Sequence, residues 1–478
     1  MLTLRRLVVW MWVLLAWAID VNPFRHAAPQ AGRTRSITFS ERIAPILYRN
    51  CVQCHRPGEA APFSLISFED VRNRGALIAK VTASRYMPPW HAEHGFGDFK
   101  DERRLTDAEI ADIGAWVDQG MPEGDRTKLP PLPRFPDGWQ LGRPDMVLEM
   151  PTAFDLPASG PDMFRNFVIS TGLSEDKWVR AIEIRPSARK VVHHVLFAYD
   201  VSDGSRRLDG ADGRPGYAST MAPIGVTPGG APSVGGLGGW AVGAPAFVMP
   251  DGHALRLPKG SDFILQTHFH LSGKEETERT RVGIYFADKA PATTLMDIPL
   301  PPLFGFGAGL TIPPGVPDYT LEDSITLPIG VHAHALYVHA HYLAKEIRAT
   351  ATLPDGTGRP LIWIRDWDFN WQDQYIYKTP VALPASTRID VRFIYDNSAD
   401  NPRNPSVPPR TVLWGEDTLD EMASVTLLVV PEASDDTSAL GRVLGDRQRL
   451  AIQRGIADGT LKRMQTQRTR SSVPSTGR

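Results

Sequence analysis

The sequence predicts a multidomain protein in which a small all-α domain precedes two all-β antiparallel sandwiches of jelly-roll-like form. Its 478 residues suffice for about three domains of ordinary size. Proline (42) and glycine (41) are abundant, and because both interrupt helices, most of the chain is expected to form strands and turns. Helical periodicity is limited to an early segment, and runs of alternating polar and apolar residues follow it.

The helical segment covers residues 36–125. Its last helix is expected to begin near Thr106 or Asp107, either of which can cap it, and apolar residues at positions 110, 113, 116 and 117 form one stripe. Residues 126–144 follow and are rich in proline, which extends the backbone and resists packing. We interpret them as a semi-rigid linker.

Short alternating runs from residue 145 onward predict antiparallel strands. Because about 290 residues exceed the roughly 100 of one sandwich, we expect two, covering residues 145–310 and 311–432, with the proline-rich turn at residues 312–315 near the boundary. The glycine-rich stretch at 223–244 is expected to be a long loop, and residues 433–478 a polar tail.

Residues 1–35 have the layout of a leader. Arg5 and Arg6 precede an apolar run over residues 7–19, which is typical of a signal peptide. No clean cleavage site follows, so an uncleaved membrane anchor is the alternative. Both predict export, to the periplasm or an equivalent compartment. A net charge of -2 gives no overall field that would attract nucleic acid.

The chain has two cysteines, and both lie in the motif Cys51-Val52-Gln53-Cys54-His55. In such a motif the two thiols attach covalently to a haem and the histidine ligates its iron. A redox Cys-x-x-Cys motif would need a βαβ context, and a zinc site would need a second pair of ligands. The motif therefore predicts one haem c in an exported redox protein.

Residues 37–125 resemble the class I cytochromes c. Met87 lies in a loop ahead of the last helix, as the sixth iron ligand does in those proteins. A His/Met pair would raise the iron potential relative to a bis-His pair. His91, His94 and Met121 are the alternative sixth ligands.

Eight of the thirteen histidines gather in the β region. They form the pairs His193 and His194, His268 and His270, His332 and His334, and His339 and His341. A His-x-His pair in a strand places both imidazoles on one face, ready to bind a metal, whereas two adjacent histidines share a metal only where the strand ends or bulges. Each pair alone could instead form hydrogen bonds at the surface. Their joint occurrence favours metal binding, but the spacing does not select the ligands.

Most of residues 140–432 resemble the type II copper monooxygenases, the group of peptidylglycine α-hydroxylating monooxygenase and dopamine β-monooxygenase, in a bacterial form fused to a cytochrome c. Four matching stretches occur in the family's order: His193-His194, residues 265–268, residues 338–345 and Asp420-Glu421-Met422. Their histidines and one methionine are residue types that bind copper.

The resemblance implies two coppers. The electron-storing copper would be held by His193, His194 and His268. The oxygen-binding copper would be held by His339, His341 and Met422, and a soft thioether ligand also favours Cu(I) on chemical grounds. His270, His332 and His334 would not be primary ligands.

The resemblance implies an enzyme that hydroxylates a C–H bond of a small organic substrate with dioxygen. Electrons would come through the fused haem from an upstream donor, either a reductant of the ascorbate kind or a redox protein. Tyr337 and Thr426 replace the arginine and tyrosine that grip the carboxylate in the peptide-amidating members, so a peptidyl-glycine substrate is not expected. The alternative is a non-catalytic electron-transfer or copper-carrying cytochrome. A cytochrome-linked dehydrogenase is not expected, because the sequence shows no dinucleotide-binding or quinone-binding motif.

Overall fold

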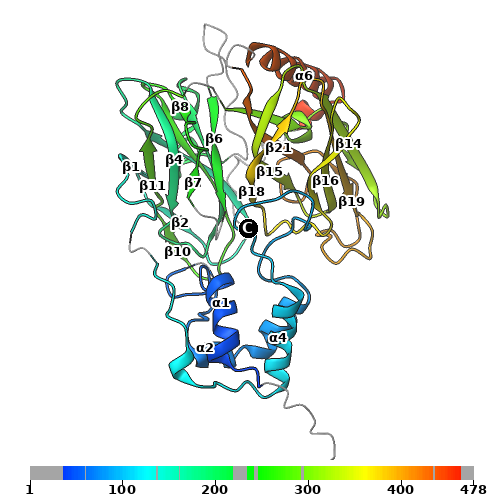
Figure 1. Cartoon of the computed structure of the whole chain (residues 1–478). Helices are drawn as coiled ribbons and strands as arrows, with labels where there is room; N and C mark the ends of the chain where they lie inside the picture. Colours follow the sequence, from blue (N-terminus) through cyan, green and yellow to red (C-terminus); the bar gives the residue numbers. More distant parts are fainter. Residues whose placement is uncertain are drawn as a thin grey trace, which may run out of the picture.

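A computed structural model describes residues 36–59, 61–135, 138–160, 162–218, 234–241, 246–291, 295–433 and 437–463. Two β units lie side by side, with a helical unit at one end of the pair (Figure 1). The expected leader at residues 1–35 lies outside the described residues, as does most of the glycine-rich stretch at 223–244. The described part of that stretch forms strand β6 (Val234–Ala241), paired with a neighbouring strand, and not the long loop that we expected. Among the described helices, none has the length and apolar character needed to cross a membrane.

The helical unit has a core of its own. Its elements are the π-helical turn η1 (Phe39–Ile43) and the helices α1 (Ala44–Asn50), α2 (Phe68–Arg72), α3 (Gly75–Ala83) and α4 (Asp107–Asp118). Thr106 caps α4 as predicted, because its hydroxyl accepts from the Glu109 N–H while the Glu109 carboxylate accepts from the Thr106 N–H. Trp116 of α4 is fully buried against Phe39. In the proline-rich segment, the 3-10 turn η2 (Arg126–Lys128) is the one described helical element.

The helical unit is not a separate all-α domain, because a loop at residues 90–104, which we call the arm, lies along the C-terminal β unit. Ala92 forms an antiparallel bridge with Ile364, and Phe99 forms another with Tyr377. Both arm side chains are buried in the core of that β unit. The prediction of a self-contained domain over residues 36–125 therefore describes the helices but not this loop, whose partners lie far away in the sequence.

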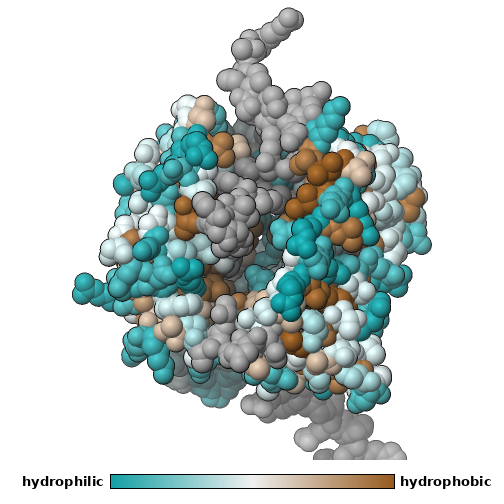
Figure 2. All heavy atoms as spheres, turned by 90° about the horizontal axis from the view of Figure 1, so that it is seen from above, coloured by the Kyte–Doolittle hydropathy of each residue, from teal (hydrophilic) through white to brown (hydrophobic). Residues whose placement is uncertain are grey.

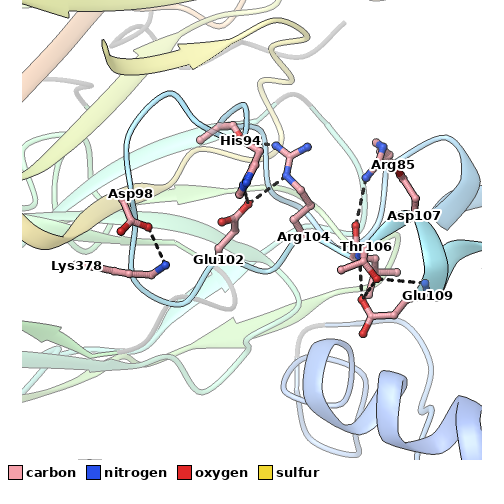
Figure 3. Close-up of polar contacts among 11 residues, drawn as sticks. Arg85, His94, Asp98, Glu102, Arg104, Thr106, Asp107, Glu109 and Lys378 are labelled. Carbon is pink, nitrogen blue, oxygen red and sulfur yellow. Dashed lines mark hydrogen bonds and ion pairs between the residues drawn. The ribbon is translucent and has the colours of Figure 1, made fainter. Parts of the chain in front are cut away.

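Polar contacts along the arm are visible in Figure 3. Asp98 forms an ion pair of 2.7 Å with Lys378 of the β unit. Glu102 contacts both His94 and Arg104, and so ties the two limbs of the arm together. These exposed pairs add little stability by themselves, so the buried apolar side chains hold the arm in place.

The N-terminal β unit is a pair of antiparallel sheets with strand orders β1-β11-β4-β7, to which β8 adds, and β3-β9-β5-β6; β10 pairs with β2. The strands are β1 (Met146–Glu149), β2 (Phe154–Leu156), β3 (Met163–Ser170), β4 (Lys177–Arg185), β5 (Val192–Asp200), β6 (Val234–Ala241), β7 (Phe247–Val248), β8 (Leu255–Leu257), β9 (Asp262–Phe269), β10 (Glu276–Glu278) and β11 (Arg281–Phe286). A short helix α5 (Gly204–Leu208) follows β5.

The C-terminal β unit has the same two-layer construction, with strand orders β12-β21-β15-β18 and β14-β19-β16-β17; β13 pairs with β20. The strands are β12 (Met296–Leu300), β13 (Thr311–Ile312), β14 (Tyr319–Thr326), β15 (Val331–Ala340), β16 (Ala344–Thr352), β17 (Gly358–Ile364), β18 (Gln374–Leu383), β19 (Arg388–Tyr395), β20 (Val412–Leu413) and β21 (Ala423–Pro431). A 3-10 turn η3 (Pro302–Gly305) follows β12. The predicted predominance of antiparallel β structure is confirmed.

Two features of the C-terminal unit differ from the sequence-based expectation. Strand β12 pairs with β21, so residues 296–310 join this unit although we assigned them to the preceding one. The segment expected to be a polar tail contains helix α6 (Thr437–Ala457), which buries Leu440 in the core and packs against Phe306. Its apolar residues recur at helical spacing, at positions 440, 443, 444 and 451. We did not predict this helix because most of the other residues in the segment are polar.

The two β units contact each other through the sheet that contains β15 and β21. Ala335, Leu428 and Val430 of this sheet belong to the apolar core of the N-terminal unit. Viewed from the end at which α6 lies, the units form two lobes on either side of a hollow (Figure 2). One face of β15 is thus directed toward the N-terminal unit, and this face carries several of the candidate histidines.

Candidate metal centres

Three imidazoles converge on one sheet of the N-terminal β unit. His193 and His194 lie at the start of β5, and His268 lies near the end of β9. The Nδ1 atoms of His193 and His194 are 3.2 Å apart, and that of His268 is 3.4 Å from that of His194. In the described part of the chain, this is the one group of three or more His, Cys, Asp or Glu side chains close enough to share a metal ion. The resemblance implied the same set.

The strand register explains how adjacent histidines can share one site. His194 lies opposite His268 on the neighbouring strand, and the register shifts between Val192 and His194. In a regular strand His193 and His194 would point to opposite faces, but a bulge removes this alternation. The condition that the sequence set for this pair is therefore met.

The outer nitrogens of the set are held by hydrogen bonds. His268 donates from Nε2 to the Asp162 carboxylate, and His193 donates from Nε2 to the Asn370 carbonyl, both at 2.9 Å. A proton on Nε2 leaves the Nδ1 lone pair directed inward. Burial, assisted by the nearby His268, lowers the pKa of His193 to about 4 and places that of His194 well below its ordinary value. Both imidazoles are therefore neutral near pH 7, the form that binds metals.

A second set lies at the end of β15. The rings of His339 and His341 are 5.2 Å apart between centroids. His339 lies opposite Ser424 of β21, so continuing the register places Met422 opposite His341, on the same face of the sheet. Burial lowers the pKa of His339 to about 4 and that of His341 to about 3. Together with the Met422 thioether that the resemblance assigns to this set, two neutral imidazoles would form a soft donor set that suits Cu(I).

In the second set the Nδ1 atoms, rather than the Nε2 atoms, are hydrogen-bonded. Nδ1 of His339 donates to the amide oxygen of Gln372, and Nδ1 of His341 donates to the backbone carbonyl of Asp420 at 3.0 Å. The Nε2 lone pairs are therefore the ones available to a metal. The first set offers Nδ1 atoms and the second offers Nε2 atoms, a difference that spacing in the sequence does not reveal.

Glu421 holds the second set together through the backbone. Its carboxyl group is fully buried and accepts hydrogen bonds from the N–H groups of His341 at 2.9 Å, Leu343 at 2.6 Å and Met422 at 3.1 Å. Two candidate ligands on different strands are thereby joined by one side chain. Glu421 lies in one of the stretches that match the copper monooxygenases, but we predicted no role for it. The signal in the sequence was an ionisable residue just before an apolar strand, where burying a charge is costly.

The two sets face each other across Phe369. Its ring centroid lies 6.2 Å from that of His193, 6.0 Å from that of His268 and 5.6 Å from that of His341. Phe369 belongs to the loop between β17 and β18, so the C-terminal unit supplies the group between the sets. No pattern in the sequence pointed to Phe369.

A cavity of about 160 Å³ adjoins the first set. Its walls include His193 and His194, and also Arg103 of the arm and Asp373 of the C-terminal unit. Burial raises the pKa of the Cys54 thiol, and the charge of Arg103 opposes that effect while Asp373 adds to it. Two residues that line the cavity, Arg103 and Asp373, thus also act electrostatically on Cys54.

The cysteine motif follows α1 in a helical turn. The N–H groups of Cys54 and His55 both donate to the Cys51 carbonyl, which places the two thiols one turn apart. His55 donates from Nδ1 to the Phe63 carbonyl at 3.1 Å, which leaves its Nε2 lone pair available. Two free thiols and one imidazole held in this way have the chemistry that covalent haem attachment needs.

The candidate sixth ligands lie in different surroundings. Met87 is half-buried beyond the end of α3. His94 is largely exposed and contacts Glu102, whereas Met121 packs its sulfur against Gly75 of α3. His91 is half-buried, accepts a hydrogen bond from no described group at Nε2, and lines the cavity beside the first set. Met87 remains our prediction for the sixth ligand of the haem iron.

The remaining histidines lie outside the two sets. His270 is mostly exposed and donates to the second oxygen of Asp162 at 2.9 Å. His334 pairs with His253 of the N-terminal unit, with ring centroids 5.6 Å apart, and His332 lies 3.9 Å from Glu432. These positions agree with the implication that none of the three is a primary ligand of the two sets.

The chain is similar over part of its length to two curated proteins. It is 26% identical over 217 residues to DBH-like monooxygenase protein 1 of Mus musculus, which covers 41% of this chain and 33% of that protein. It is 27% identical over 173 residues to DBH-like monooxygenase protein 1 of Homo sapiens, with 31% and 27% covered. The chain thus spans about a third of the length of the curated relatives it matches.

Comparisons with protein-family models and with solved structures add no information about the function of this chain. No protein-family model matches the chain. The VP2 subviral particle of infectious bursal disease virus matches with a TM-score of 0.17 and 11% identity, covering 62% of this chain and 74% of that chain. The major capsid protein P2 from bacteriophage PM2 matches with a TM-score of 0.22 and 11% identity, covering 56% and 97%. The relationship that the comparisons support is therefore a distant similarity to DBH-like monooxygenase proteins.

Proposed function

We propose that the chain is a copper-dependent monooxygenase that hydroxylates a C–H bond of a small organic substrate with dioxygen. The observation that carries the proposal is the convergence of His193, His194 and His268 in one β unit, with the pair His339 and His341 on the other unit. We propose that Met422, which the strand register places opposite His341, completes the second set. One set offers three imidazoles, and the other would offer two imidazoles and a thioether. The similarity to DBH-like monooxygenase proteins adds independent support.

The two sets suit different tasks. His193, His194 and His268 would hold a copper that stores an electron, because three imidazoles stabilise both Cu(II) and Cu(I). His339, His341 and Met422 would hold a copper that must stay reduced to meet dioxygen, because a thioether favours Cu(I). Bound copper would supply the one-electron chemistry and the activation of dioxygen that no protein side chain provides.

The protein's own residues would fix the geometry. Gln372 and the Asp420 carbonyl hold the imidazoles of the second set with Nε2 directed away from them. Glu421 keeps the backbone of both strands in place beside these ligands. Phe369 limits the water between the sets, since its ring contacts imidazoles of both.

We propose that a c-type haem attached at Cys51 and Cys54, with His55 and Met87 on its iron, supplies the electrons from an upstream donor. The free thiols and the available Nε2 of His55 support this assignment. Arg103 and Asp373 act electrostatically on Cys54 and also line the cavity beside the first set, which supports entry of electrons on this side. Attachment of a haem of this type requires export, so the leader-like residues 1–35 and this motif support the same periplasmic location.

The substrate is proposed to be a small molecule without a terminal peptide carboxylate. Tyr337 and Thr426 are register partners on β15 and β21, on the same face as His339. Neither offers the guanidinium that would pair with a carboxylate. This pair therefore disfavours a peptidyl-glycine substrate.

Copper counting with X-ray absorption spectroscopy tests the proposal. The reduced, copper-loaded protein should hold two coppers and show a sulfur scatterer at bonding distance, which Met422→Ala should abolish while one copper stays bound. Met249→Ala is the matched control, because Met249 is equally buried, lies in the apolar core of the other β unit and is not a proposed copper ligand. A single copper without sulfur coordination would contradict the proposal and would instead indicate a copper-carrying protein.

The electron supply needs its own test. In a host that attaches c-type haem, the protein should carry one haem that survives denaturation, and Cys51→Ser with Cys54→Ser should lose it. The Met87→Ala spectrum should change from six-coordinate low spin toward high spin. An unchanged spectrum would contradict the assignment of Met87 and move the ligand to His91, His94 or Met121.

A further inference from the structure

We infer that Asp162 is a positioning residue that sets the direction of electron flow between the two proposed coppers, by placing a negative charge on a ligand of the first one. The inference rests on the proposed function. It begins from a difference between the two donor sets that the ligands themselves do not show, namely the groups to which their outer nitrogens are hydrogen-bonded.

The strand register places Asp162 beside His268. Phe164 of β3 lies opposite His268 of β9, and Asp162 precedes β3 by one residue, so it lies opposite His270. Side chains two residues apart share a face, so Asp162, Phe164, His268 and His270 all project from the same side of the sheet. Phe164 and His268 thus lie on the paired strands β3 and β9, and Asp162 and His270 directly adjoin the ends of these strands.

Each oxygen of the Asp162 carboxylate is engaged by one imidazole. Oδ2 accepts from Nε2 of His268, and Oδ1 accepts from Nδ1 of His270, both at 2.9 Å. The Asp162 side chain is 16% exposed and that of His268 is 1% exposed, whereas that of His270 is 64% exposed. The carboxylate of Asp162 therefore contacts the buried ligand His268 on one side, and the exposed His270 covers its other side.

Two contacts restrain the plane and the rotation of the His268 ring. Its plane is stacked on Phe164, with centroids 4.2 Å apart and an interplanar angle of 10°. Its Nε2 is held by Asp162, so its Nδ1 is the atom that faces His194. Removing the carboxylate would leave the stacking but release both the tautomer and the rotation about the ring axis.

Three of the four other ligand imidazoles donate to neutral groups, and the fourth, His194, contacts the Nδ1 atoms of His193 and His268. His193 donates to a backbone carbonyl, His339 to a side-chain amide and His341 to a backbone carbonyl. Within the described residues, Asp162 provides the one carboxylate that accepts from a ring nitrogen of either set. The first set alone therefore carries an anionic hydrogen-bond acceptor.

This asymmetry has a redox consequence. A carboxylate that accepts from a ligand imidazole makes the imidazole a stronger donor and adds negative charge, and both effects favour Cu(II) over Cu(I). The thioether and the neutral acceptors of the second set favour Cu(I). An electron on the first copper would thus move downhill to the second, and Asp162 would maintain that difference.

The experiment measures the potential of the first copper alone. In a Met422→Ala background that leaves copper at the histidine triad, an EPR-monitored redox titration gives the ratio of Cu(II) to Cu(I) affinity. Asp162→Asn keeps the size of the side chain and removes the charge, and it should shift this ratio at least tenfold toward Cu(I), which is 59 mV for one electron. Asp162→Glu should restore most of the original value, because it returns the carboxylate.

Two controls separate position from general destabilisation. Asp176→Asn removes a carboxylate on the far side of the same unit, where it accepts from Arg256 and the Lys259 N–H, and it should leave the potential unchanged. His270→Gln leaves the carboxylate on His268 and should shift the ratio less than threefold. A potential that is unchanged in Asp162→Asn, or one that Asp162→Glu fails to restore, would overturn the inference while leaving the proposed function intact. If the unmodified protein binds no copper at the triad, the proposed function fails instead, and this inference with it.

Discussion

Replacing Glu421 by Gln should change how the stability of the metal-free protein depends on pH. Burial raises the pKa of Glu421 from 4.5 to about 8, even though the backbone N–H groups of His341, Leu343 and Met422 lower it. In the unfolded chain the group ionises near its ordinary value, whereas in the folded protein it stays protonated until about pH 8. Glutamine has about the size of the protonated acid and does not titrate. Its amide nitrogen cannot accept a backbone N–H bond as either oxygen of Glu421 does, but this loss of stability does not depend on pH.

The sign and size follow from these pKa values. The stabilising contribution of Glu421 is complete below pH 4.5 and is lost as the pH rises toward about 8, because the unfolded chain then releases a proton that the folded protein keeps. Each pH unit in this window costs about 1.4 kcal/mol. Between pH 5 and pH 7 the free energy of unfolding of the unmodified protein should therefore fall by about 3 kcal/mol relative to that of Glu421→Gln.

Urea denaturation of both proteins at several pH values, followed by circular dichroism, measures this difference. Histidine titrations contribute equally to both proteins and cancel. Asp200→Asn is the matched control, because hydrogen bonds from Ser205 and Ser202 outweigh the opposing effect of burial and lower the pKa of Asp200, so its difference should be flat over the same range. A flat difference for Glu421→Gln as well would refute the reasoning, and would mean that three backbone N–H groups keep the carboxylate ionised.

Two further predictions concern metal retention and the arm. Copper at the two sets should stay bound down to about pH 5 during stepwise dialysis, because the pKa of His193 and that of His339 both lie at about 4, and loss of copper already near pH 6.5 would contradict this. Phe99→Ala should lower the free energy of unfolding by about 3–5 kcal/mol, as expected for a buried aromatic ring, since Phe99 is 3% exposed and stacks on Tyr377. A loss below about 1 kcal/mol would mean that the arm contributes little to the core.

Local patterns predicted the elements that depend on local forces. The capped start of α4 and the alternation of the strands could be read from neighbouring residues, because capping and pleating act over a few positions. The bulge before His194 could be stated only as a condition, because it depends on the partner strand β9. The family resemblance, rather than periodicity, selected which histidines to group.

The features that were missed depend on contacts between distant segments. Asp162 and Glu421 act through hydrogen bonds to residues about 80 to 100 positions away, and Phe369 reaches both β units from a loop. No spacing rule connects such residues. The arm was missed for the same reason, since Ala92 and Phe99 pair with strands more than 270 residues further along the chain.

The arm also changes how electron delivery in this chain should be pictured. A proline-rich linker alone would let a donor unit search for its acceptor on a tether, at a rate set by effective concentration and by the viscosity of the solvent. Because the arm is built into the core of the C-terminal β unit, the helical unit has a second attachment that removes this search. A redox group held at Cys51 and Cys54 would then transfer electrons across one constant distance, and the transfer rate would not depend on solvent viscosity or linker length.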